Sequence, residues 1–264
     1  MNSGQPVRIA ILSVASLAAM SAGVVVLLPV AAVTLFRARR LYAAATTQMA
    51  RVILRLWGVR IVVHPDQPFP REQTIYISNH TSTLDLFVLV ALGLPNTRFF
   101  LSGFLRKYIP LGILAYLMGT FFTVPQNRQA ERVRIFQRAD RILRRTRESV
   151  YLSPEGGRIT TGEIGRFNKG SFHLATSLKA PIVPMFLYVP PAIDPGMGFN
   201  ARAGAVHVHV KPAIQTAHWR LEDLERNTEA MRGMFVQWHR EIRDMNHGEH
   251  ATAAIVLPTA IEVR

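Results

Sequence analysis

The chain has 264 residues, of which 49% are hydrophobic, so it is long enough for one folded domain with a short appendage. It contains 31 Lys and Arg against 17 Asp and Glu, a net charge of +14, and it has no cysteine, which excludes a cysteine nucleophile. The excess positive charge predicts an anionic partner. No DNA- or RNA-binding motif accompanies it, so we expect no nucleic acid as partner.

The N-terminal segment from residue 9 to residue 36 contains no charged side chain. As one straight helix it would be about 42 Å long, against a hydrocarbon core of roughly 30 Å, so it is either a span kinked at Pro29 or a helix lying partly in the interface. Three arginines follow it (Arg37, Arg39 and Arg40) and one precedes it. This asymmetry predicts attachment to the inner (cytoplasmic) membrane with the rest of the chain in the cytoplasm. A cleaved signal peptide is the less favoured alternative, because the apolar run exceeds the roughly 7–15 residues of a signal core.

Short apolar strands alternate with amphipathic segments through the rest of the chain. Strands are predicted at 59–63, 74–77, 98–101, 150–152 and 206–210, and helices at 41–57, 85–92, 128–147 and 221–245, the apolar run 104–118 being either a buried helix or the lining of an apolar slot. This alternation predicts an α/β fold with a mixed, largely parallel sheet flanked by helices. We expect an anchor with an interfacial helix at 1–58, one domain at 59–246, and a tail at 247–264 without an assignable role. The helix at 128–147 carries an arginine-rich face, which we expect to meet anionic lipid headgroups or ligand phosphates.

The most informative feature is the pair His80 and Asp85, which follows the predicted strand at 74–77. Histidine exchanges a proton readily near neutral pH, and a carboxylate can orient its ring. Residues five apart on one helix lie roughly 140° apart, so the pair can meet only if His80 is in a loop and Asp85 is near the start of the next helix. For an isolated match, a capping aspartate and a structural loop histidine would explain the pattern equally well.

Three downstream segments favour the chemical interpretation. They are Ser153-Pro154-Glu155-Gly156-Gly157-Arg158, then Phe167-Asn168-Lys169-Gly170, then Pro181-Ile182-Val183-Pro184. With Asn79-His80-x4-Asp85 before them, their order and spacing resemble the glycerolipid acyltransferase family (the lysophosphatidic acid acyltransferase, or PlsC-like, group) over roughly residues 55 to 215.

The resemblance implies an O-acyltransferase of phospholipid biosynthesis and an acyltransferase domain at 59–246. The acyl donor would be acyl-CoA or an acyl-carrier-protein thioester, the acceptor 1-acylglycerol-3-phosphate, and the product phosphatidic acid. His80 would be the general base oriented by Asp85. The substrate-binding residues would be Asn79, Glu155, Gly156, Gly157, Arg158, Arg128 and Lys169.

Two departures from the family pattern fall in the segments that, in the family that the chain resembles, bind the acceptor phosphate. Gly157 stands where the family usually has Thr, and in the second motif, Gly119-x-x-Phe122, the next arginine, Arg128, comes three positions late. They leave the acceptor open: another lysophospholipid or a lyso-aminolipid of the lyso-ornithine type is the alternative. A noncatalytic lipid-binding membrane protein is less favoured, because His80 and Asp85 are both present.

Direct attack of the acceptor hydroxyl on the thioester is the simpler route, since the chain has neither a cysteine nor a G-x-S-x-G motif. We expect no cofactor and no metal. His207 and His209 share one face of the strand at 206–210, but no third ligand is evident, so we expect them to be solvated.

Overall fold

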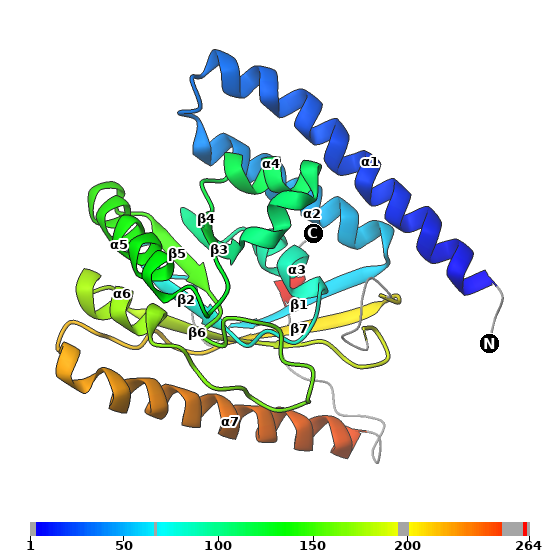
Figure 1. Cartoon of the computed structure of the whole chain (residues 1–264). Coiled ribbons are helices and arrows are strands. Elements are labelled where there is room, and N and C mark those ends of the chain that lie inside the picture. Colours follow the sequence, from blue (N-terminus) through cyan, green and yellow to red (C-terminus); the bar gives the residue numbers. More distant parts are fainter. Residues whose placement is uncertain (1–3, 66–67, 195–200, 250–260, 263–264) are drawn as a thin grey trace.

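The computed structural model describes residues 4–65, 68–194, 201–249 and 261–262 (Figure 1). Its strands are β1 (Val59–Pro65), β2 (Ile75–Ser78), β3 (Thr97–Ser102), β4 (Phe121–Thr123), β5 (Ser149–Leu152), β6 (Ile182–Tyr188), β7 (Gly204–Val210) and β8 (Ile261–Glu262). They form one sheet in the order β4-β3-β5-β2-β6-β7-β1-β8. Neighbours from β4 to β6 are parallel, β6 and β7 are antiparallel, and β1 is parallel to β7 but antiparallel to β8. The predicted mixed, largely parallel sheet is confirmed.

The helices are α1 (Gly4–Val33), α2 (Arg39–Leu56), α3 (Leu84–Leu92), α4 (Ile109–Leu117), α5 (Gln129–Thr146), α6 (Gly170–Leu178) and α7 (Leu224–Glu249), with single 3-10 turns η1 (Gly103–Lys107) and η2 (Leu221–Asp223). Every helix and strand expected from the periodicity is present within a few residues of its predicted bounds. The short elements β4, α6 and β8 were not predicted, and neither was β6, whose first residues were noted only as part of the motif at 181–184. The three residues of β4 are too few to show a periodicity, and most of α6 is buried, so it lacks a polar face. Of the predicted tail at 247–264, residues 250–260 and 263–264 lie outside the described residues.

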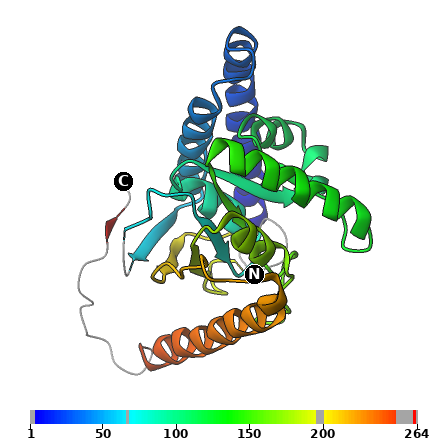
Figure 2. The ribbon, with the colours of Figure 1, turned by 90° about the vertical axis from the view of Figure 1, so that its left-hand side faces the viewer.

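The two faces of the sheet pack against different helices (Figures 1 and 2). On one face Tyr76, Met185 and Val208 pack in a core with α2 and α3. On the other face Ile75, Ile77 and Phe186 pack with α5, α6 and α7. The alternation of Ile75, Tyr76 and Ile77 between the cores follows from the pleat, which turns successive side chains to opposite faces.

The N-terminal helix α1 is continuous through Pro29 and packs against α2 and α4. Its inner side is buried at Val24, Leu27 and Ala31. The Trp57 indole donates to Ser16 Oγ at 2.9 Å, so α1 is also tied to the end of α2. The outer side exposes a row of large apolar side chains (Val7, Ile11, Val14, Leu17, Val25 and Val26). Within the described residues, this is the one helix long and apolar enough to cross a membrane.

The apolar run at 104–118 divides into η1 and α4, and it is both core and surface. Leu114, Ala115 and Leu117 are buried, whereas Phe104 and Ile109 are more than half exposed. The run therefore adds apolar surface to the part of the molecule where α4 packs on α1 and α2 (Figure 1).

The parallel pairing of β2 with β5 brings two distant loops to one edge of the sheet. Ile77 of β2 lies opposite Leu152 of β5, so the chain leaves both strands at the same level. The carboxyl ends of adjacent parallel strands are where α/β folds bind ligands. Here the loop after β2 carries His80 and the loop after β5 carries Glu155.

Candidate active site

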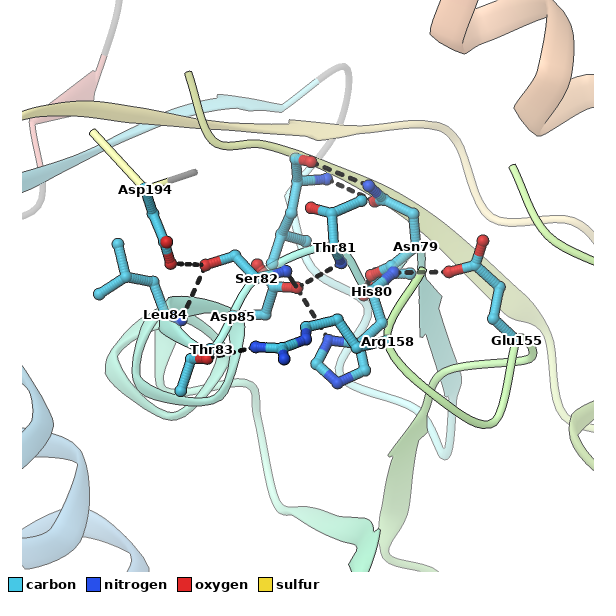
Figure 3. A network of polar contacts seen from close by, with 12 residues as sticks. Asn79, His80, Thr81, Ser82, Thr83, Leu84, Asp85, Glu155, Arg158 and Asp194 are labelled. Atoms are coloured by element: carbon cyan, nitrogen blue, oxygen red, sulfur yellow. Dashed lines mark hydrogen bonds and ion pairs between the residues drawn. The ribbon is translucent and has the colours of Figure 1, made fainter. Parts of the chain in front are cut away.

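The histidine–aspartate pair forms at the corner between β2 and α3 (Figure 3). His80 lies in the loop after Ser78, and Asp85 lies in the first turn of α3, as the five-residue spacing predicted. His80 Nδ1 is 2.8 Å from Asp85 Oδ2. A carboxylate can accept only from a protonated Nδ1, so the neutral imidazole keeps its acceptor lone pair on Nε2. The ring is one-third exposed, which leaves that nitrogen within reach of a substrate.

Asp85 holds the loop as well as the ring. Its side chain is 1% exposed. Besides the imidazole, Oδ2 accepts from the backbone N–H of Thr81 at 2.8 Å and of Ser82 at 2.9 Å. Charge-assisted bonds of this kind are the stronger ones, so the carboxylate fixes the backbone on both sides of the turn. Oδ1 is buried without a hydrogen-bond partner in the described part of the chain.

Asn79 clamps the same loop to β6. It is buried, its amide donates to the Leu187 carbonyl at 2.9 Å, and its carbonyl accepts from the Leu187 N–H at 2.8 Å. Both groups of the amide are therefore used within the protein. The structure gives Asn79 a scaffold contact, whereas the sequence predicted a contact with substrate.

Glu155 supports His80 from the neighbouring loop. Its Oε2 accepts from the backbone N–H of His80 at 2.7 Å, and its Oε1 accepts from the N–H of Gly165 at 2.8 Å. Burial raises the pKa of this carboxyl above its usual value, although the two backbone N–H groups act in the opposite direction. Both carboxylate oxygens of Glu155 therefore accept from backbone N–H groups, which positions the His80 loop. The sequence had predicted a contact with substrate for this residue.

The two glycines after Glu155 have different surroundings. Gly156 has φ +68°, and a Cβ there would lie 2.6 Å from Asn168 Nδ2, so this position requires glycine. That amide donates at 3.0 Å to the carbonyls of Pro154 and Glu155 and so closes the loop. A Cβ on Gly157 would meet no atom within 4 Å. Gly157 thus borders open space next to Arg158.

Arg158 lies beside the imidazole of His80 at the mouth of the site (Figure 3). Its Nη1 donates to Thr83 Oγ1 at 2.6 Å, and the contact is exposed. A guanidinium with one nitrogen engaged still offers several N–H donors to a phosphate. Of the three predicted cationic residues, Arg158 is the one that the structure brings next to the pair.

Arg128 and Lys169 are turned to other partners. Arg128 is the residue directly before α5 and is 3.6 Å from Glu131, with both side chains at least half exposed. Lys169 forms an ion pair with Glu225 on α7. Neither interaction involves the residues around His80.

The glycine of the second motif has a packing role. Gly119 has φ +75°, and a Cβ there would lie 2.4 Å from Arg98 Nη1. Arg98 donates to the Gly119 carbonyl at 3.1 Å and pairs with the buried Glu148, which also binds Arg39 of α2. Burial by itself would raise the pKa of Glu148, but the two guanidinium groups bring it below its usual value. This cluster joins the first residue of α2 to the sheet.

Two residues that the sequence analysis did not identify, Ser82 and Asp194, stabilise the loop between β2 and α3. Ser82 Oγ donates to Asp194 and accepts from the N–H of Leu84 at 2.9 Å, which fixes the entry into α3. Asp194 is buried in the segment after β6, 112 positions from Ser82. No local pattern marks it, so only the tertiary contact could reveal it.

His207 and His209 have a neighbour that the sequence did not suggest. His64 on β1 lies 3.0 Å from His207 (Nε2 to Nδ1), and its ring centroid is 4.6 Å from that of His209. The three rings are partly buried, and burial lowers the pKa of His209 to about 4. The predicted solvated face is therefore wrong. Across the described residues, no group of three or more His, Asp or Glu is arranged to hold a metal.

Comparison with known proteins agrees with the motifs. The acyltransferase family model matches residues 60–188, which include His80, Asp85 and the Glu155 loop. The 1-acyl-sn-glycerol-3-phosphate acyltransferase of Saccharomyces cerevisiae is 29% identical over 195 residues, covering 72% of this chain and 63% of the yeast protein. The Limnanthes alba protein of the same name is 26% identical over 189 residues, covering 70% and 66%. The chain therefore spans less than two thirds of the length of these relatives.

A solved structure supports the fold. The crystal structure of the 1-acyl-sn-glycerophosphate (LPA) acyltransferase, PlsC, from Thermotoga maritima superimposes with a TM-score of 0.67, covering 89% of this chain and 98% of that one. At 16% identity, this likeness concerns the fold alone. Residues 60–188 of the chain form an acyltransferase domain, as the family model and the sequence relatives show, and the fold agrees with that assignment.

Proposed function

We propose that the chain transfers an acyl group from an acyl thioester to the free hydroxyl of 1-acylglycerol-3-phosphate, giving phosphatidic acid. The observation that carries this proposal is the His80–Asp85 pair, with Nδ1 held at 2.8 Å by a buried carboxylate and the ring open to solvent on its other side. The acceptor is suggested by the names of the sequence relatives, which are 1-acyl-sn-glycerol-3-phosphate acyltransferases.

In the proposed first step, His80 Nε2 removes the hydroxyl proton of the acceptor while its oxygen attacks the thioester carbonyl. Asp85 holds the ring in the required tautomer and stabilises the imidazolium that forms. A positioned base contributes about 10²–10⁴-fold in rate, or roughly 3–5 kcal/mol.

In the second step, the tetrahedral intermediate collapses, the carbon–sulfur bond breaks and the new ester remains on the acceptor. The departing thiolate takes the proton from His80, so the free thiol of the donor is released and the base is restored. No acyl-enzyme is needed, in keeping with a chain that has no cysteine. The donor is acyl-CoA or an acyl-carrier-protein thioester.

Arg158 is the proposed contact for the acceptor phosphate. Its loop meets His80, since the N–H of the next residue, Ile159, donates to the His80 carbonyl at 2.8 Å, and the Arg158 side chain is exposed (Figure 3). A planar guanidinium binds two phosphate oxygens at once, which would orient the glycerol hydroxyl toward the base. Arg128 and Lys169, which the sequence grouped with it, pair with Glu131 and Glu225, away from the residues around His80, and this position makes them less suited to the role.

We also propose that the protein works at a membrane surface, with residues 1–58 as the anchor and 59–246 as the acyltransferase domain. The support is the exposed apolar side of α1, together with the exposed Phe104 and Ile109 of the apolar run whose helix α4 packs on α1. Because α1 is packed along α2 and α4, we expect it to lie with the domain in one leaflet. The three arginines after α1 would contact anionic headgroups, which favours the cytoplasmic leaflet of the inner membrane.

The chemistry is tested with purified, detergent-solubilised protein, palmitoyl-CoA as donor, and a panel of acceptors: 1-acylglycerol-3-phosphate, lysophosphatidylcholine and lyso-ornithine lipid. Thiol release that depends on 1-acylglycerol-3-phosphate and yields phosphatidic acid is the expected result. Release with another lysolipid alone would move the function to that acceptor. Lipid binding without thiol release from palmitoyl-CoA or a palmitoylated carrier protein would favour a noncatalytic protein.

The anchor is tested with a double variant, Val14→Glu and Val25→Glu. Both residues are exposed on α1, so the side of the helix that packs on α2 and α4 is unchanged. Flotation with vesicles of phosphatidylglycerol and phosphatidylethanolamine should fall sharply. Ala230→Glu, on the exposed side of α7, is the control and should float like the parent. Equal flotation of all three proteins would leave the anchor role of α1 without support.

A further inference from the structure

A broad groove lies between α5 and α6, closed at one end by the segment before α7. Its volume is about 1130 Å³. Five cationic side chains line it (Arg132, Arg141, Lys169, Lys179 and Arg220), against the single carboxylate of Asp140. The groove is therefore strongly positive, and neither the base nor the proposed phosphate contact of the active site uses it.

The positive charge of the groove is largely available to a ligand. Asp140 is engaged within the protein, since it accepts from Ser177 Oγ at 2.6 Å and from Arg144 Nε at 2.8 Å. The ion pairs Lys169–Glu225 and Arg220–Glu222 are both exposed. Such pairs contribute at most about 1 kcal/mol and exchange readily for a better anionic partner.

The groove also has apolar surface between its charged rims. Val133 and Leu221 are more than half exposed, and Phe136 also lines the groove. Apolar side chains flanked by cations match an amphipathic helix with an acidic border.

The basic surface continues beyond the groove. Arg134, Arg138, Arg141 and Arg145 follow one stripe of α5 and are all exposed. This stripe covers eleven residue steps, or about 16 Å along the helix, which is more than one phosphate group would contact. Because α5, α6 and α7 pack on the sheet face opposite α2 and α3, the groove is also on the other side of the molecule from the apolar surface of α1 and α4 (Figures 1 and 2). These features favour a soluble acidic protein over a small anion or a membrane.

One end of the groove meets the active-site loops. Asn168 lines the groove and donates to the carbonyls of Pro154 and Glu155, and Glu155 in turn accepts from the N–H of His80. A partner in the groove would therefore sit next to the loop that positions the base. Gly157, in the same loop, borders open space through which a flexible thioester arm could pass.

We propose that the α5–α6 groove is the docking surface for an acidic helix of a small carrier protein that presents the acyl thioester. This inference rests on the proposed function, because it assigns the donor's carrier and its place of contact. The carrier's acidic residues would face the arginines of α5 and Arg220, and its apolar residues would face Val133 and Leu221.

The test compares two donors, palmitoyl-CoA and a palmitoylated acidic acyl carrier protein, with 1-acylglycerol-3-phosphate at a fixed concentration. The variant carries Arg141→Glu and Arg220→Glu, both at exposed positions where folding should be unaffected. The matched control carries Arg240→Glu and Arg243→Glu on the exposed side of α7, with the same change in charge. Thermal unfolding checks that all three proteins fold alike.

The expected result is a rise of about tenfold or more in KM for the carrier-protein donor with kcat retained, and a change below about twofold for palmitoyl-CoA. The control should change neither. An equal rise for both donors would assign the groove to the nucleotide of coenzyme A and overturn the protein partner. No change with either donor would overturn the docking surface altogether.

Direct binding separates this inference from the proposed function. Holo-carrier protein without an acyl chain should bind the immobilised parent protein at low salt and lose that binding in the variant, whether or not any acceptor is acylated. If neither donor supports transfer but the parent still binds the carrier protein and the variant does not, the proposed function fails while the groove remains supported as a docking surface. If the variant instead loses binding to phosphatidylglycerol vesicles and not to the carrier, the groove is a lipid contact and the inference is wrong.

Discussion

The two sides of the candidate site are built very differently. Around His80, the side chains of Asn79, Asp85 and Glu155 are buried and hydrogen-bonded to backbone groups of three segments. By contrast, Arg158, the proposed acceptor contact, is exposed, and its guanidinium donates to Thr83 Oγ1 at 2.6 Å. The difference indicates that the scaffold fixes His80, the proposed base, before substrate arrives, and we expect the proposed phosphate contact of Arg158 to become ordered with the ligand.

The largest expected effect is the loss of the base. His80→Ala should lower kcat by about 10²–10⁴-fold, because no group replaces the proton acceptor. The measurement is transfer to 1-acylglycerol-3-phosphate, with thermal unfolding to show that the protein remains folded. His218→Ala, an exposed histidine, is the control. A His80→Ala protein with near-parental turnover would contradict the mechanism.

Asp85→Asn should have the next largest effect. An asparagine can accept from Nδ1 or present an NH₂ group to it, so the ring loses its fixed tautomer and the stabilising charge. We expect kcat to fall about 10–100-fold. The backbone bonds at 2.8 and 2.9 Å to Thr81 and Ser82 also weaken, so part of the loss should appear in Tm. Unchanged kcat would mean that the carboxylate serves the loop alone.

Asn79→Ala should act through the scaffold. It leaves the N–H and C=O of Leu187 buried without the side-chain partner that each has in the parent. An unsatisfied buried group costs about 1–3 kcal/mol, so Tm should fall by several degrees. Activity should fall while the KM for the acceptor changes little, because the loop loosens without loss of a phosphate contact. Gln237→Ala, at an exposed site on α7, should leave Tm unchanged. A raised acceptor KM with parental Tm would restore the predicted substrate contact for Asn79.

Arg158→Lys should have a smaller effect, confined to the acceptor. The charge remains but the bidentate fork is lost, so KM for 1-acylglycerol-3-phosphate should rise by up to about tenfold, with little change for the donor. A phosphate-free acceptor should not respond. Parental kinetics in this variant would remove the phosphate assignment and favour a lyso-aminolipid acceptor, while the roles of His80 and Asp85 would stand.

Arg128→Lys should have the smallest effect of all. The side chain is exposed and pairs at 3.6 Å with Glu131, away from the base. We expect acceptor KM within about twofold of the parent, since exposed ion pairs contribute little. A KM increase like that expected for Arg158→Lys would show that the loop before α5 folds back onto the acceptor. Arg128 would then belong with Arg158 to the exposed acceptor side of the site.

The sequence by itself determined the elements that depend on local pattern. Hydrophobic periodicity predicted α2, α5 and α7 and most strands, because a helix or strand must bury one side with period 3.6 or 2. The spacing of His80 and Asp85 predicted a loop residue facing the first turn of a helix, since that geometry depends on only six consecutive residues. The family motifs then pointed to the chemistry without any tertiary information.

Only the tertiary structure decided which side chains serve the base and which serve something else. Asn79 meets Leu187 across 108 positions, Glu155 meets His80 across 75, and Ser82 meets Asp194 across 112. These contacts depend on strand order and on where each loop leaves the sheet, which local pattern does not encode. For the same reason Arg158 lies beside His80 while Lys169 pairs with α7, although the sequence offered both as phosphate ligands. Long-range pairing of strands, and not residue type, separates the two.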